Sequence, residues 1–297
     1  MNKGIILILL GYVGWGLFPL YWALVKHVPA FEVLSHRMLW SVPVLILFVV
    51  LITSWRSDFF STLKNKRELG WLLLTSILIT INWGVYVYAV NNDRVVEASM
   101  GYFLSPLLHV LGGLVIFKEQ LGPLRKLAIT FATLGVLYYI FSVEVFPWIG
   151  LVVGFSFAAY GILRKFIKTS AVPGLLVETL LLVPLSLGYL VYIEISGEAV
   201  FLNLDLNTDI FLGLAGLVTV VPLVLFTAGA RLLPMTTSGI LFYITPTMQF
   251  LIGAFIFKET VNTDQLIGFS GIWIGLVLYT FSLLSRQAKI EPNREST

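Results

Sequence analysis

The sequence predicts an all-α membrane protein in which ten transmembrane helices form two inverted repeats of five helices each. Three observations support this prediction: the composition is too apolar for a water-soluble protein, ten apolar stretches have membrane-spanning length, and one motif recurs at a fixed distance along the chain. We therefore expect a first repeat over residues 1–143, a second, inverted repeat over residues 144–285 and a short cytoplasmic tail over residues 286–297.

The composition identifies lipid as the main solvent of this chain. Apolar side chains make up 58% and charged side chains 12% of its 297 residues, and the mean hydropathy is +0.93. Soluble proteins carry about 25% charged residues, which keep their surface compatible with water. Each membrane crossing takes roughly 20 residues, so ten crossings occupy about 200 positions and leave no room for a separate soluble domain.

Several classes of function are excluded by what the sequence lacks. The net charge is only +3 and the basic residues are scattered through loops, so nucleic-acid binding is not expected. The absence of cysteine excludes disulfides and thiolate metal sites. Motifs that cradle phosphates, bind dinucleotides or hold zinc through two histidines are also missing. We therefore predict no catalytic residue, no metal and no cofactor.

The expected membrane spans are apolar stretches bounded by charged or turn residues. They cover residues 4–22, 34–54, 70–90, 99–117, 126–142, 147–163, 174–192, 210–229, 237–257 and 265–284. The turn at Glu144 and Pro147 between the fifth and sixth stretches is tight, and a single kinked element is the alternative there.

The distribution of basic residues predicts the orientation in the membrane. With ten spans and a cytoplasmic N-terminus, most of the 19 lysines and arginines fall on the cytoplasmic side, as the positive-inside rule requires. The exceptions are Lys26, Arg37, Arg94 and Lys258. An odd number of spans would scramble this bias, so we expect both termini in the cytoplasm.

A recurring motif indicates that the chain contains two copies of one unit. The segment from Ser105 to Glu119 recurs from Thr245 to Glu259, and each copy ends in Ile-Phe-Lys-Glu, 140 residues apart. Five spans per copy is an odd number, so the second copy must cross the membrane in the opposite direction. Inverted repeats around a site at the membrane midplane allow a transporter to open alternately to each side.

Polar side chains inside the spans are the candidates for a substrate cavity, because polar groups avoid lipid and face the bundle interior. Asn82 lies midway along its span, with Tyr86 one helical turn later on the same face. Tyr102 and His109 share one face of the fourth span, and Gln249 lies 140 residues after His109. We expect all five to face the cavity, with hydrogen bonding between helices as the alternative role.

Two aromatic residues and two prolines complete the predicted cavity and its gates. Trp15 and Tyr243 lie well inside their spans and are expected to stack on a flat or apolar substrate, with core packing as the alternative. Pro106 and Pro246 occupy equivalent positions in the two copies. Because proline removes a backbone hydrogen bond and kinks a helix, we expect hinges there, with passive bending as the alternative.

Two charged residues lie about one helical turn inside the membrane boundary. Arg37 is expected to guard the outer mouth of the cavity, with a local ion pair or a snorkelling guanidinium as the alternative. Glu178 lies deep enough to be desolvated, which suits proton coupling. A salt bridge from Glu178 to Arg164 or Lys165 is equally consistent with the sequence.

Three motifs carry a resemblance to a known family. HRMLWS at 36–41, AVNN at 89–92 and GYFLSPL at 101–107 resemble the RarD proteins, a branch of the drug/metabolite transporter superfamily built from two EamA repeats. The similarity runs from about residue 4 to residue 284. Ser105 stands where the family commonly has asparagine, and Tyr88 where it commonly has tryptophan. The resemblance implies ten helices in the EamA fold, a bacterial inner membrane and a secondary transporter, often an exporter.

The sequence therefore predicts a secondary transporter that exports a small organic metabolite or drug-like molecule by alternating access. Its expected partners are the substrate, the lipid bilayer and a proton or counter-substrate. The small residues Gly271 and Gly275 allow close contact with another helix, and that helix can belong to the same chain or to a second copy, so a homodimer is an open alternative. The alternative functions are a non-transporting membrane assembly or sensory protein and, less favoured, an intramembrane enzyme.

Overall fold

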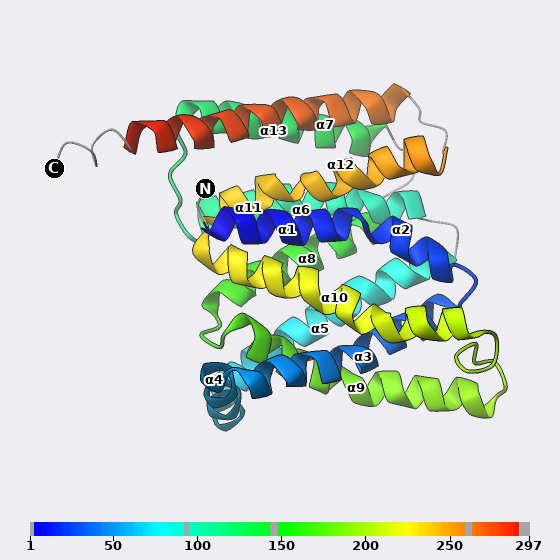
Figure 1. Ribbon diagram of the computed structural model, residues 1–297. Coiled ribbons are helices and arrows are strands. Elements are labelled where there is room, and N and C mark those ends of the chain that lie inside the picture. Colours follow the sequence, from blue (N-terminus) through cyan, green and yellow to red (C-terminus); the bar gives the residue numbers. More distant parts are fainter. Residues whose placement is uncertain (1–2, 92–94, 143–147, 259–262, 291–297) are drawn as a thin grey trace.

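The computed structural model describes residues 3–91, 95–142, 148–258 and 263–290, and it is a bundle of helices with no strand in these ranges (Figure 1). The α-helices are α1 (Lys3–Gly16), α2 (Phe18–Trp22), α3 (Ala30–Leu51), α4 (Thr53–Lys64), α5 (Lys66–Asn91), α6 (Val95–Val115), α7 (Pro123–Phe141), α8 (Trp148–Phe166), α9 (Ala171–Ile195), α10 (Leu206–Leu232), α11 (Met235–Phe242), α12 (Ile244–Leu251) and α13 (Thr263–Ile290). A 3₁₀ turn at Ala23–Val25 follows α2, and a π-helical turn at Ile252–Ile256 follows α12.

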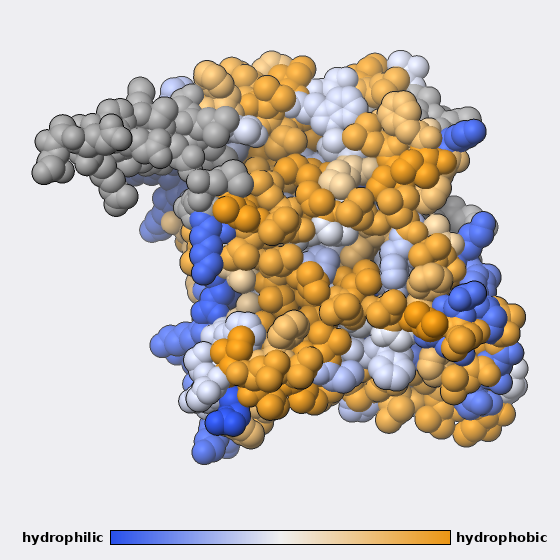
Figure 2. Space-filling model, viewed as in Figure 1, coloured by the Kyte–Doolittle hydropathy of each residue, from blue (hydrophilic) through white to orange (hydrophobic). Residues whose placement is uncertain are grey.

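The bundle has the surface of a multi-pass membrane protein. Within the described ranges, 7 helical segments are long and apolar enough to cross a bilayer, and shorter apolar helices cover Gly101–Val115 and Leu266–Ser282. Figure 2 shows apolar residues across the middle of the visible face and hydrophilic residues gathered at its two ends. An apolar belt between polar ends matches the layers of a bilayer.

Prolines interrupt two of the predicted spans. The first span breaks at Leu17, between α1 and α2, just before Pro19, and the ninth breaks at Tyr243, between α11 and α12, just before Pro246. Proline has no backbone N–H to continue the helical ladder. Pro106, by contrast, lies inside the continuous helix α6.

Two predicted boundaries are changed by the structure. The stretch after α3 forms a separate helix, α4, which is not apolar and was not expected from hydropathy. The turn at Glu144 and Pro147 lies outside the described residues. On either side of it, α7 packs against α13 and α8 packs against α6, so the fifth and sixth stretches are two elements rather than one kinked helix.

Helices that lie 140 residues apart pack against each other. A methyl group added at Gly135 of α7 would lie 2.5 Å from the Gly268 carbonyl oxygen of α13, and one added at Gly275 would lie 2.6 Å from the Ala128 carbonyl oxygen. Gly275 and Gly268 follow Gly135 and Ala128 by 140 residues each. The contact of Gly135 with Gly268 and the contact of Gly275 with Ala128 are therefore equivalent, as expected for two antiparallel helices that occupy the same position in the two copies. Gly271 and Gly275 thus pack against α7 of the same chain.

The 140-residue offset also relates other residues of the bundle. The Tyr243 hydroxyl donates a hydrogen bond to the carbonyl oxygen of Phe103, the residue 140 positions earlier (3.1 Å). Lys118 and Lys258 share an unusual left-handed backbone, with φ of 50° and 57°. Few non-glycine residues adopt this conformation, so its presence at both positions reflects the shared motif.

The two ends of the bundle differ in charge. At one end, here called the basic end, α1 begins (Figure 1), α8 ends with Arg164 and Lys165 in its last turn, and α10 ends with Arg231 in its last turn. Glu119, in the segment after α6, accepts hydrogen bonds there from the backbone N–H groups of Met235 (2.6 Å) and Thr236 (3.0 Å) at the start of α11. At the opposite end, Asp205 caps α10, and hydrogen bonds from Thr208 hold the pKa of its carboxyl below the usual value.

Candidate functional site

A cavity of about 250 Å³ lies in the half of the bundle away from the basic end. The chain runs away from the basic end along α1–α2 and along α5, and residues late in these elements, such as Trp22 and Tyr86, line the cavity. It runs back toward the basic end along α3 and α6, which line the cavity with early residues such as Arg37 and Tyr102. We call it the outer cavity. Its lining includes five of the seven predicted substrate-binding residues, namely Trp15, Asn82, Tyr86, Tyr102 and Gln249.

Arg37 projects from α3 into the wall of the outer cavity. Its Nε atom donates a hydrogen bond to the Thr219 hydroxyl of α10 (3.0 Å). Its guanidinium carbon lies 4.8 Å from the ring centroid of Trp22, 5.2 Å from that of Trp83 and 5.9 Å from that of Phe18. Among the described residues it forms no ion pair with a carboxylate, so aromatic faces rather than a local ion pair surround this charge.

The predicted amides line the cavity while also joining helices. The Asn82 side-chain amide donates hydrogen bonds to the Val153 carbonyl oxygen (2.7 Å) and to the Ser156 hydroxyl (3.1 Å) of α8. The Gln249 amide donates to the Trp15 carbonyl oxygen (3.0 Å), where the first span breaks. Both predicted roles, cavity lining and hydrogen bonding between helices, therefore apply to the same side chains.

Aromatic rings form most of the remaining lining. The rings of Tyr86 and Tyr102 meet edge to face with their centroids 5.8 Å apart, and both phenols lie near the Arg37 guanidinium. Trp15 packs edge to face against Phe157 at 5.8 Å. The outer cavity thus presents flat apolar faces together with phenol hydroxyls, which suits a small molecule with an apolar body and a few polar groups.

His109 and Tyr243 do not line the outer cavity, which corrects the sequence prediction. His109 is buried where α6 crosses α8; its Nδ1 atom lies 2.9 Å from the Ser105 carbonyl oxygen, and a methyl group added at Gly161 would lie 2.4 Å from its Nε2 atom. Tyr243 is buried in the contact with α6. Tyr102 and His109 do share one face of α6, but α8 covers that face at His109.

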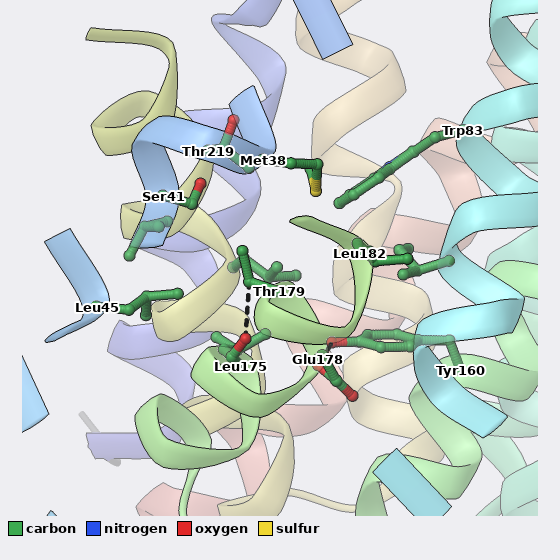
Figure 3. Close-up of a pocket in the computed structure, with 13 residues that line it drawn as sticks. Met38, Ser41, Leu45, Trp83, Tyr160, Leu175, Glu178, Thr179, Leu182 and Thr219 are labelled. Carbon is green, nitrogen blue, oxygen red and sulfur yellow. Dashed lines mark hydrogen bonds between the residues drawn. The ribbon is translucent and has the colours of Figure 1, made fainter. Parts of the chain in front are cut away.

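A second, much smaller cavity of about 20 Å³ lies nearer the basic end and is called the inner pocket. Figure 3 shows Glu178 and Thr179 of α9 beside Tyr160 of α8 in its wall. Arg164 forms an ion pair with Glu178 at 3.4 Å, and both side chains are 5% exposed. Of the two sequence interpretations of Glu178, the salt bridge with Arg164 is thus the one present in this conformation.

The Glu178 carboxylate has further partners around it. The Tyr160 hydroxyl donates to its Oε2 atom (3.3 Å), and the Thr75 hydroxyl donates to its Oε1 atom. Lys165 is turned away and donates to the Leu233 carbonyl oxygen (2.6 Å). The one charged group among the described residues in the wall of the inner pocket is therefore satisfied by neighbouring side chains, in contrast to Arg37 in the outer cavity.

A shared wall separates the outer cavity from the inner pocket. Ile79, Trp83, Thr219 and Leu223 line both spaces, and Thr219 and Leu223 follow Ile79 and Trp83 by 140 residues. The wall is therefore built from equivalent residues of the two copies. Sequence reasoning missed Thr219 and Trp22 as lining residues; the 140-residue offset, applied to the third span around Ile79, would have pointed to Thr219.

Pro106 and Pro246 lie at the contact between α6 and the broken α11–α12 segment. The Pro106 carbonyl oxygen would lie 2.7 Å from a methyl group added at Gly239 of α11, so these helices touch backbone to backbone. Pro246 lies in the first turn of α12, next to the break at Tyr243. The break is a discontinuity at which α12 could move relative to α11, as the hinge prediction requires.

Comparisons with known proteins agree on one family. The model of the EamA-like transporter family matches residues 2–141. The "Uncharacterized transporter YojE" of Bacillus subtilis is 38% identical over 95% of this chain and 94% of its own. "Protein RarD" of Streptomyces exfoliatus is 37% identical over 92% and 86%, and "Protein RarD" of Escherichia coli is 33% identical over 97% and 97%.

The same architecture occurs in a solved structure. One crystal structure aligns with a TM-score of 0.72 over 96% of this chain and 99% of that chain. The sequences are 16% identical, so the likeness concerns the fold alone.

Proposed function

The chain belongs to the RarD branch of the EamA-like transporter family, and on that basis we propose that it is a secondary transporter that carries a small organic molecule by alternating access. Relatives in Bacillus subtilis and Pseudomonas aeruginosa are named transporters, which favours transport over the assembly, sensory and enzymatic alternatives. Export is the direction we propose.

The proposed architecture is ten spans in two inverted repeats, residues 1–143 and 144–285, followed by the tail at 286–297. The antiparallel packing of α7 on α13 and the matched backbone of Lys118 and Lys258 support this arrangement. With the basic end in the cytoplasm of a bacterial cell, both termini are cytoplasmic and the outer cavity faces away from the cytoplasm.

The observation that carries the proposal is the unequal size of the two cavities across one shared wall. The outer cavity measures about 250 Å³ and the inner pocket about 20 Å³, and the wall between them contains the equivalent pairs Ile79 with Thr219 and Trp83 with Leu223. Exchange of the conformations of two inverted repeats would enlarge the inner pocket and close the outer cavity. Substrate held at the wall would then change sides.

Proton or counter-substrate coupling would involve the inner pocket. Protonation of Glu178 would remove the charge that Arg164 faces and weaken the 3.4 Å ion pair. Because that ion pair links α8 to α9 beside the closed pocket, its release favours opening toward the basic end. We propose Arg37 and Glu178 as the charged gates of the outer and inner sides.

Transport into sealed vesicles tests the proposal. The full chain, reconstituted into liposomes, is expected to exchange at least one labelled compound from a panel of amino acids, amines and antibiotics, with the compound recovered unchanged. A converted product would instead indicate an enzyme, and the absence of flux for every compound would favour an assembly or sensory role.

Paired variants test whether the outer cavity is the route. Asn82→Ala removes a lining amide and is expected to reduce flux by about tenfold or more, whereas His109→Ala, outside the lining, should reduce it less at equal protein abundance. Normal flux in Asn82→Ala would remove the cavity from the proposed route.

A further inference from the structure

The outer cavity contains a positive charge that no described residue neutralises. Arg37 is the one formally charged side chain among its described lining residues, and no described carboxylate lies within ion-pair distance of it. Burial of a cation away from water is costly unless an anion compensates it. At Arg164 the compensating anion is Glu178, whereas none of the described residues supplies an anion at Arg37.

The contacts of Arg37 leave the end of its guanidinium available. Thr219 accepts the hydrogen bond from Nε, and the rings of Trp22, Trp83 and Phe18 contact the guanidinium through their faces or edges. The terminal nitrogens make no hydrogen bond to a described residue. The two N–H groups on that end form a planar fork whose geometry matches the two oxygens of a carboxylate.

The surroundings of the fork add donors and apolar surface. Tyr86 and Tyr102 line the same cavity as Arg37, and their phenol hydroxyls can donate hydrogen bonds to an anion. Trp15, Phe157 and Phe242 supply apolar faces for the rest of a ligand. At about 250 Å³ the cavity is smaller than the roughly 300–1,000 Å³ typical of drug-sized sites, so the ligand is a small metabolite.

We infer that the outer cavity selects organic anions: the substrate carries a carboxylate that pairs with Arg37 and a compact apolar body that packs against the tryptophans. This inference rests on the proposed function, since it names the substrate class of the proposed cavity. A cationic amine is disfavoured at the same site because it would meet Arg37 with like charge.

Matched sets of small molecules test the charge preference directly. Each set shares one apolar body and differs in the polar group: phenylacetate, 2-phenylethylamine and 2-phenylethanol share a phenyl ring, indole-3-acetate, tryptamine and tryptophol share an indole, and hexanoate, hexylamine and hexanol share an alkyl chain. Binding is measured on the purified full chain in detergent from the rise in unfolding midpoint with ligand concentration. In at least one set the carboxylate should bind about tenfold more tightly than the alcohol, and no amine should bind more tightly than its carboxylate.

Variants then assign the preference to Arg37. Arg37→Gln should abolish the advantage of the carboxylate over the alcohol, and Arg37→Lys, which keeps the charge but loses the fork, should retain part of it. Arg125→Gln is the matched control: Arg125 likewise donates from Nε to a hydroxyl, that of Ser282 (3.3 Å), and lies 5.4 Å from a ring, that of Tyr279, but it does not line the cavity. It should leave the preference unchanged.

The outcomes separate this inference from the proposed function. Carboxylate binding that depends on Arg37 supports the inference even if no flux is found in vesicles. Absence of a carboxylate advantage in all three sets, or an advantage that survives Arg37→Gln, overturns it even if other compounds are transported.

Discussion

The outer cavity and the inner pocket lie on either side of one wall, yet the charged side chain in each wall has opposite surroundings. In the inner pocket, Glu178 is paired with Arg164 at 3.4 Å and accepts hydrogen bonds from Tyr160 and Thr75. In the outer cavity, Arg37 has aromatic neighbours and Thr219 but no described carboxylate partner. One charge is satisfied by the protein, and the other is left for a ligand.

This difference arises within a duplicated scaffold. Glu178 on α9 corresponds, at the 140-residue offset, to Met38 on α3, the residue next to Arg37. The two copies therefore place opposite charges at neighbouring positions of equivalent helices. The helix contacts of the two copies are close to symmetric, whereas the chemistry of the two cavities is not. Under the proposed function, this asymmetry makes the outer cavity the one that receives the substrate in this conformation.

The largest expected effect is on chemical access to the two spaces. The native chain has no cysteine, so single cysteines can be introduced without background. Leu34→Cys lines the outer cavity and Leu182→Cys lines the inner pocket, and both leucines are half-buried. A membrane-impermeant thiol reagent added outside intact cells should modify Leu34→Cys and leave Leu182→Cys unmodified.

The shared wall provides the control for that experiment. Trp83→Ala removes the largest side chain between the two spaces and should make Leu182→Cys reactive from outside. Equal reactivity of both cysteines with Trp83 intact would contradict the separation of the two cavities.

A second effect, on stability, contrasts the paired and the unpaired charge. Arg164→Met leaves Glu178 buried without its cation and should lower the free energy of unfolding by about 3–5 kcal/mol. Arg37→Met removes a charge that has no described anionic partner, so its cost should stay below about 1 kcal/mol. Unfolding midpoints of the detergent-solubilised variants provide the measurement.

A double variant distinguishes the ion pair from simple packing. Arg164→Met combined with Glu178→Leu removes both charges and should recover most of the stability lost by Arg164→Met alone. If the losses of the single variants instead add, the inner pair is not the source of the difference between the two sites.

Much of this organisation could be predicted from the sequence, and the reasons are physical. Hydropathy predicts spans because lipid imposes length and composition on a helix, and depth within a span placed Asn82, Tyr86 and Tyr102 in the cavity. The failures concern contacts between helices. His109 shares a face with Tyr102, but which part of that face α8 covers depends on the crossing point at Gly161, which one-dimensional periodicity does not contain.

Other features also depend on three-dimensional packing. Thr219 becomes a partner of Arg37 because α3 and α10 pack together; the 140-residue offset from Ile79 points to its place in the wall, but not to this hydrogen bond. The ion pair of Glu178 likewise depends on the position of Arg164, which lies on another helix.

The smallest expected effect concerns how Arg37 is held. Thr219→Val keeps the shape of the side chain but removes the acceptor for Nε of Arg37 (3.0 Å). Loss of one hydrogen bond to a charged group should weaken carboxylate binding by about tenfold while leaving alcohol binding unchanged. Thr219→Ser restores the hydroxyl and should recover the binding, which a purely steric role of Thr219 would not predict. Equal weakening for the carboxylate and the alcohol would show that Thr219 shapes the wall between the cavities rather than positioning the charge.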